Sequence, residues 1–167
     1  MGYNHKSIND PNGLIKSKDP NKIGRSLDEF KVGQILEFSH TFTQKETEMM
    51  GDLIGDHNPF HYDGPFVKAT RFQRPIVHGM LLAGMICHFG GDLFPGPGYL
   101  AERMDFDFHL PVYFGDTIRA VGTIKAIEIA HKRVTLHMKC YNTENQCVMS
   151  GNVTGIPFQV DKPSSNE

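Results

Sequence analysis

The chain has 167 residues, of which 39% are hydrophobic and 22% charged, and its formal net charge is -2. That length is enough for one domain with a sizeable core. With no basic excess and no Lys/Arg-rich run, the composition argues against nucleic acid as a partner. The three cysteines lie far apart and form no Cys-x-x-Cys pair. This spacing argues against a disulfide scaffold or a thiolate zinc site and fits a reducing compartment.

The two ends of the chain differ in composition from its middle. Residues 1–28 are rich in Asn, Lys, Ser, Asp and Pro, and they predict an irregular N-terminal arm without the apolar core of a signal peptide. Residues 161–167 predict a flexible tail. We therefore expect one domain over residues 29–160 in a cytoplasmic protein.

The first regular elements are a strand and a helix. Residues Gly33–Thr43 alternate loosely and predict a strand. Thr43 and Glu46 have the spacing of a capping box, so a helix is expected to begin at Thr43 and to end at Gly55. Its apolar residues recur at helical spacing: Met49, Met50, Leu53 and Ile54.

A long apolar segment follows a proline-rich loop. Residues 56–75 predict a loop with at most one short turn, because Pro59 disfavours helical backbone at Asn58. Residues Gly79–Phe94 are apolar on nearly every face, which predicts a helix buried all round. At about 24 Å it is short for a membrane span, and His88 interrupts it.

The rest of the chain changes to the two-residue period of strands. Alternating segments cover residues 103–111, 115–130, 133–142 and 147–158, with a slip near Ala126 that indicates a bulge. They predict a meander of at least four strands. The fold class expected is α+β, a curved antiparallel sheet wrapped around one long apolar helix.

The segment Gly55–Asp63, GDHNPFHYD, concentrates polar chemistry in nine positions. His57 and His61 are four apart, the spacing of zinc ligands on a helix, but Pro59 lies between them and no third ligand follows at a recognisable spacing. We expect no metal here.

Proton transfer is the alternative reading of this segment. Asp56 and His61 flank a proline turn that can bring a carboxylate and an imidazole about one water molecule apart, with Asn58 able to orient either group. Histidine titrates near neutrality, as acid–base work requires. An Asx turn, in which Asp56 only binds backbone N–H groups, explains these residues equally well.

A second constellation lies at the start of the apolar segment. Gly79 stands where the first N–H groups of a helix lack partners, and a glycine there lets a carbonyl oxygen approach closely. This is the chemistry of an oxyanion hole, although Gly79 could equally serve close packing. His78 reads first as a hydrogen-bonded structural residue at the helix start.

Taken together, the motifs resemble a known family. G-D-x-N-P-x-H-x-D, then Ala69 and Phe72, then R-P-I-V-H-G-M resemble the signature of the MaoC-like (R)-specific enoyl-CoA hydratases, which have the hot-dog fold. The resemblance implies hydration of a trans-2-enoyl-CoA to an (R)-3-hydroxyacyl-CoA, or the reverse dehydration. It implies no cofactor and no membrane or nucleic-acid partner. It also implies a homodimer or higher even oligomer with acyl-CoA at the subunit boundary.

The resemblance also implies roles for single residues. Asp56 and His61 would activate one water, the Gly79 amide would hold the thioester oxygen, and Asn58 and His78 would support them. Cys87 replaces a serine common in close relatives, which changes a polar contact expected within the pocket. Two other functions stay open on the residues alone: a hot-dog acyl-CoA thioesterase and a non-catalytic acyl-CoA-binding subunit.

Overall fold

The computed structural model describes residues 8–9, 19 and 21–163. Its strands are β1 (Ile8–Asn9), β2 (Lys22–Gly24), β3 (Ile35–Thr41), β4 (Tyr99–Phe108), β5 (Thr117–Glu128), β6 (Arg133–Tyr141), β7 (Cys147–Pro157) and β8 (Gln159–Asp161). Its helices are η1 (Leu27–Glu29), α1 (Gln44–Ile54), η2 (Pro59–His61), α2 (Pro65–Ala69), α3 (Gly79–His88) and the π-helical segment η3 (Phe89–Leu93).

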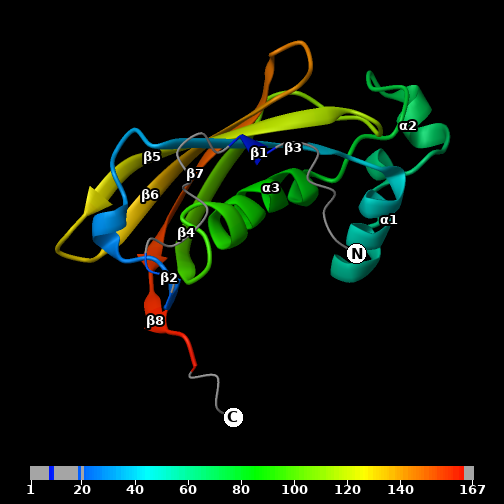
Figure 1. Cartoon of the computed structure of the whole chain (residues 1–167). Helices are drawn as coiled ribbons and strands as arrows, with labels where there is room; N and C mark the ends of the chain where they lie inside the picture. The colour runs from blue at the N-terminus through cyan, green and yellow to red at the C-terminus, as the bar shows by residue number, and fades with distance from the viewer. Residues whose placement is uncertain (1–7, 10–18, 20, 164–167) are drawn as a thin grey trace.

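A curved antiparallel sheet wraps over α3, with α1 and α2 at one end of the molecule (Figure 1). The strand order is β1-β3-β5-β6-β7-β4. The core lies between the sheet and α3, and it is built from the residues whose alternation predicted strands, among them Val134, Leu136, Met138 and Cys140 of β6, all fully buried. The predicted α+β hot-dog architecture is confirmed.

The strand neighbours differ from the predicted meander. β5, β6 and β7 do follow one another, but β4 pairs with β7 rather than with β5. Alternation reveals which face of a strand is buried but not which strand lies beside it, and residues 109–116 carry the chain from β4 across to β5. The predicted bulge is confirmed, since the β5–β6 register shifts between Ile124 and Ala126.

Helix α1 begins and ends at the predicted residues. The Thr43 hydroxyl accepts from the Glu46 N–H at 3.3 Å, and the Glu46 carboxylate accepts from the Thr43 N–H at 2.7 Å. Gly55 ends the helix in the left-handed conformation, at φ 75°. The apolar stripe of α1 is nevertheless largely exposed: Leu53 is 81% exposed, and the buried residues of this helix are Thr47 and Gly51.

The predicted loop over residues 56–75 contains two short helices, so the expectation of at most one turn is wrong. Both η2 and α2 have a proline at the first position of the helix, Pro59 and Pro65. Proline lacks an N–H, but the first helical turn needs none, and its fixed φ suits the helix start. The prolines that predicted a loop therefore begin helices.

The central helix is also shorter than predicted. Regular α-helix ends at His88, and the chain continues as the π-helical turn Phe89–Leu93. It is not buried all round, because Met80 and Cys87 are exposed in the single chain. Among the described residues, no helix is long and apolar enough to cross a membrane.

The ends of the chain are partly ordered. Of the predicted irregular arm, residues 1–7, 10–18 and 20 lie outside the described residues, while β1 pairs with β3 and β2 pairs with β8. Of the predicted tail, Asp161 ends β8 and residues 164–167 lie outside the described part. The division at residues 28 and 160 stays a prediction.

Gly122 of β5 sets how closely the helical layer approaches the sheet. A Cβ at this position would stand 2.4 Å from the ring of Phe89 and 3.0 Å from the sulfur of Met138. Because Phe89 is fully buried, we expect Gly122→Ala to lower the free energy of unfolding by about 1–3 kcal/mol in urea titrations. Gly84→Ala in α3, where a Cβ meets nothing within 4 Å, is the matched control and should be neutral or stabilising. Equal stability of the two variants would contradict this account.

Candidate active site

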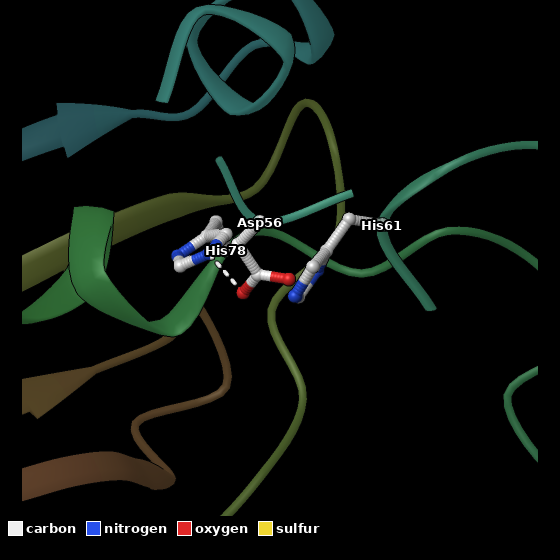
Figure 2. Close-up of side chains that lie close together, drawn as sticks. All are labelled: Asp56, His61 and His78. Atoms are coloured by element: carbon white, nitrogen blue, oxygen red, sulfur yellow. Dashed lines mark hydrogen bonds and ion pairs between the residues drawn. The ribbon is translucent and has the colours of Figure 1, made fainter. Parts of the chain in front are cut away.

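Three side chains from separate elements converge at one end of α3. Asp56 follows α1, His61 ends η2, and His78 is the N-cap of α3. One carboxylate oxygen and one nitrogen of each ring lie within 4.8 Å of one another. The Asp56 carboxylate lies between the two imidazoles (Figure 2). The structure thus brings together the predicted pair and adds His78 to it.

Local backbone contacts fix the loop that carries the pair. The Asp56 N–H donates to the Gly51 carbonyl at 3.0 Å, so the chain reverses directly after the left-handed Gly55. The Ile76 N–H donates to the Phe60 carbonyl at 3.0 Å and ties the loop to the segment that leads into α3. These contacts hold the loop and the helix start against each other.

The hydrogen bonds of His78 determine its tautomer. Its Nδ1 accepts from the Met80 N–H at 3.1 Å, so Nδ1 carries a lone pair. Its Nε2 lies 2.8 Å from Asp56 Oδ2 and must therefore donate the ring proton to the carboxylate. His78, which is 4% exposed, is neutral in this arrangement and serves both α3 and Asp56.

Asp56 is held as a carboxylate. The hydrogen bond from His78 is the largest cause that lowers the pKa of Asp56 below its ordinary value of 3.8, followed by the bond from the Asn58 N–H at 3.1 Å. Both donors favour the charged form. The Asp56 side chain keeps 42% of its surface exposed, so it is accessible to a further partner.

His61 has the opposite tautomer. Its Nδ1 lies 3.0 Å from the Ile76 carbonyl, which can only accept, so Nδ1 donates. In the neutral ring Nε2 then carries a lone pair and can take a proton. The ring of His61 stands 4.6 Å from that of His78, centroid to centroid. The loop thus offers one ionised carboxylate and one unprotonated nitrogen.

The cluster of Asp56, His61 and His78 has the residue types of a metal site, yet its hydrogen bonds oppose one. A ligand nitrogen must present a lone pair to the ion. His78 Nε2 carries the proton given to Asp56, and the lone pair on Nδ1 is occupied by the Met80 N–H. Moving the proton to Nδ1 would break the cap of α3. The donor set fits proton transfer better than coordination.

Gly79, the first residue of α3, faces the same pocket as His61. The pocket has a volume of about 290 Å³, and most of its walls are apolar, with Phe72, Leu82 and Phe108 among them. A Cβ on Gly79 would come within 3.2 Å of the Phe108 ring. The absence of a side chain at Gly79 therefore leaves the backbone at the positive end of α3 open to this space.

Asn58 and Cys87, the other two predicted site residues, do not make the side-chain contacts expected of them. The Asn58 side chain caps η2 by accepting from the Phe60 N–H, and Asn58 supports Asp56 through its backbone rather than its amide. Cys87 is exposed on α3 and does not line the 290 Å³ pocket, so the structure gives no support for the predicted contact there.

Sequence reasoning missed two features of this site. The bond between His78 and Asp56 joins residues 22 apart, and no periodicity relates them. Arg71 lines the pocket beside His61, although nothing in its sequence context distinguished it from a surface arginine. His57, which follows Asp56 in the sequence, is not part of this cluster: its Nδ1 lies 3.1 Å from the Tyr62 hydroxyl.

Comparison with known proteins identifies one family model and several relatives that match most of the chain. A model of the MaoC like domain matches residues 29–146. The (R)-specific enoyl-CoA hydratase of Aeromonas caviae is 32% identical over 118 residues, which cover 71% of this chain and 88% of the relative. A mitochondrial 3-hydroxyacyl-[acyl-carrier-protein] dehydratase of Arabidopsis thaliana is 28% identical over 132 residues, covering 76% of this chain and 77% of the relative.

A solved structure agrees with these matches. The (R)-hydratase from A. caviae involved in PHA biosynthesis superposes with a TM-score of 0.72 at 31% identity. The match covers 76% of this chain and 96% of that one.

His78→Asn separates the two tasks of His78. Asparagine still caps a helix but is too short to reach Asp56. Without the His78 proton, the pKa of Asp56 should rise toward its ordinary value of 3.8, which an NMR titration of the Asp56 carboxyl carbon measures directly. We also expect kcat/KM to fall about tenfold near pH 7. This titration and rate assays at pH 7, both with His57→Gln as control, test the account; an unmoved Asp56 pKa contradicts it.

Proposed function

Because the chain belongs to the MaoC-like domain family, we propose that it adds water to a trans-2-enoyl thioester and forms an (R)-3-hydroxyacyl thioester, with coenzyme A as the carrier. The chain is an enzyme of the hydratase and dehydratase class. The observation that carries the finer proposal is the pair of opposed tautomers, which leaves a carboxylate and an unprotonated His61 nitrogen as neighbours. Two adjacent acceptors suit a molecule with two O–H donors, which is water.

The opposed tautomers also assign separate tasks to the pair. His61 takes a proton from water as the oxygen attacks C3, and the C2–C3 π electrons move toward the thioester oxygen. The resulting imidazolium then returns the proton to C2, and the enolate collapses to the thioester. Asp56 stays ionised throughout, accepts the second O–H and balances the imidazolium charge. Hydrogen and hydroxyl thus add across the double bond without any external oxidant or reductant.

The thioester oxygen becomes negative while the proton is on His61. The N–H of Gly79, at the positive end of α3 and facing the same pocket, is positioned to hold it. An oxyanion donor of this kind contributes about 3 kcal/mol. Reversal of the same steps removes water, so the geometry serves hydration and dehydration alike. The physiological direction then follows from the concentrations of substrate and product.

The reaction is tested with crotonyl-CoA, whose ultraviolet absorbance falls as the conjugated double bond is hydrated. Asp56→Asn and His61→Gln should each lower kcat/KM by about 10²–10⁴-fold, because each removes one of the two groups around the water. Since they act as a unit, the double variant should lose little more than the worse single variant. Chiral analysis of the product should give the (R) alcohol.

His57→Gln is the matched control, because His57 lies in the same loop but 60% exposed and turned toward Asp52 and Tyr62. Its kcat/KM should stay within about twofold of the wild type. Release of free thiol in step with the loss of absorbance would instead identify a thioesterase. Binding of the thioester without either change would identify a non-catalytic subunit.

We further propose that two copies pair along β4. Within the described residues, β4 is an edge of the sheet, and almost all of its side chains are exposed, including Leu100 at 59% and Phe108 at 50%. Unpaired, apolar edges are uncommon in stable monomers. Because Phe108 and Leu110 line the pocket, a second copy beside β4 would cover its open side.

Light scattering at micromolar concentration should give twice the mass of the chain, or a higher even multiple. Leu100→Glu with Met104→Glu places charge at two exposed apolar positions of β4 and should yield a monomer with reduced activity. Ile129→Glu alters a more exposed apolar residue, 73% exposed in the turn between β5 and β6, and should leave the mass unchanged. A wild-type monomer would refute the proposal.

A further inference from the structure

The segment between α2 and α3 carries two arginines three residues apart. The Gln73 N–H donates to the Thr70 carbonyl at 3.2 Å, and the Thr70 hydroxyl donates to the Val67 carbonyl at 2.8 Å. These bonds form a defined turn around Arg71, and Arg74 follows it. The two side chains therefore project from a fixed piece of backbone rather than from a loose loop.

Each guanidinium lies on an aromatic ring. Arg71 stands 4.9 Å from the centroid of Phe72, and Arg74 stands 3.9 Å from that of Tyr113. Stacking orients the planar group by its faces and leaves the N–H donors at its edges available. Both cations are thus pre-organised for an acceptor that the aromatic rings do not supply.

Neither arginine has an acidic partner among the residues that the structure describes. No carboxylate oxygen of this part of the chain lies within 4.0 Å of Arg71 or Arg74. Arg119 and Arg133, on the sheet, pair with Glu37 and Glu102. The two stacked cations therefore differ from these sheet arginines in lacking a carboxylate.

Their position relates them to the pocket. Arg71 lines it together with His61 and Gly79. Tyr113, beneath Arg74, forms an isolated β-bridge with Ile76 of the pocket wall. Most of the other walls are apolar, and a charge at the edge of such a space interacts more strongly than one in open water.

We propose that Arg71 and Arg74 bind an anionic oxygen group, carboxylate or phosphate, of the thioester substrate at the rim of this pocket. The inference rests on the proposed function, because it concerns the same pocket. A guanidinium edge matches both groups in two-pronged geometry. In a thioester substrate the anion has two sources: a phosphate of the carrier, or a carboxylate at the far end of the acyl chain.

Three substrates separate these sources: crotonyl-CoA, which carries phosphates; the crotonyl thioester of N-acetylcysteamine, which carries no anion; and the 4-carboxybut-2-enoyl thioester of N-acetylcysteamine, which carries only the acyl carboxylate. Each is assayed with the wild type, Arg71→Gln, Arg74→Gln and the double variant. Lys132→Gln, in the exposed turn between β5 and β6, removes one surface charge as control.

We expect Arg71→Gln to lower kcat/KM about 10- to 100-fold, mainly through KM, for the substrates that carry the recognised anion. The uncharged thioester should change less than twofold. A loss confined to crotonyl-CoA identifies the carrier phosphate, and a loss confined to the carboxylated thioester identifies the acyl carboxylate. Arg71→Lys keeps the charge without the planar guanidinium, so its kcat/KM should lie between those of the wild type and Arg71→Gln. Equal losses on all three substrates, or no loss on any, overturn the inference.

A binding measurement keeps this inference separate from the catalytic proposal. Calorimetry of the Asp56→Asn protein with free CoA and with glutarate gives Kd at several salt concentrations, without turnover. Arg71→Gln should raise Kd for the recognised anion about 10-fold or more and flatten its salt dependence. If the wild type hydrates none of the three thioesters while this dependence persists, the hydratase proposal fails and the anion site stands. If hydration proceeds and substitution of either arginine leaves Kd unchanged, the proposed anion site is wrong.

Discussion

The hydrogen bond between His78 and Asp56 joins the two halves of the site. One half is the loop after α1, and the other is the first turn of α3, where Gly79 faces the pocket. The sheet holds α3 by burying its apolar residues, whereas the hydrogen bonds to the Asp56 carboxylate come from His78 and Asn58. Without His78, the N–H of Asn58 would be the one remaining hydrogen-bond donor to that carboxylate within the described part of the chain. The distance between the Asp56 carboxylate and the oxyanion donor thus depends on one neutral imidazole, while the Ile76 backbone holds His61.

Histidine suits position 78 because the position requires an acceptor and a donor on one rigid side chain. The acceptor must reach the backbone N–H two residues on, as any N-cap does. The donor must point the other way, across 2.8 Å to Asp56. Serine, threonine or asparagine could satisfy the first demand but not the second. The imidazole is also neutral, so it donates a hydrogen bond to Asp56 without adding a positive charge. A positive charge at His78 would compete with an imidazolium at His61 for the Asp56 carboxylate.

The sequence predicted local features well because their signals are local. The capping box at Thr43, the stop at Gly55 and the alternation of β5 to β7 depend on residues a few positions apart. The pairing of β4 with β7 depends on the whole chain and was not predicted. The stripe of α1 followed the right period, yet Thr47 and Gly51 are buried and Leu53 is exposed. Periodicity shows that apolar residues share one face of a helix, but it does not show that this face meets the core of the same chain.

The site itself was predicted in part, for the same reason. The motif brought Asp56, His61 and Gly79 into one hypothesis through resemblance, and the fold places them at one pocket or beside it. The tautomers of His61 and His78 could not be predicted from the sequence, since they depend on hydrogen bonds with the Ile76 carbonyl and the Met80 N–H. Cys87 shows the converse: a position inferred from relatives need not line the pocket of a single chain.

One short segment links substrate anchoring to the reacting groups. Residues 71–79 carry Arg71 at the pocket rim, the Ile76 carbonyl that fixes His61, and His78 and Gly79 at the start of α3. An anion held by Arg71 would be fixed on the same piece of backbone as the N–H that receives the thioester oxygen. Binding energy from a remote part of the substrate would then help to hold the reacting carbonyl in place, and its loss would raise KM more than it lowers kcat. A thioester without that anion reaches the same groups but must be aligned by the apolar walls alone.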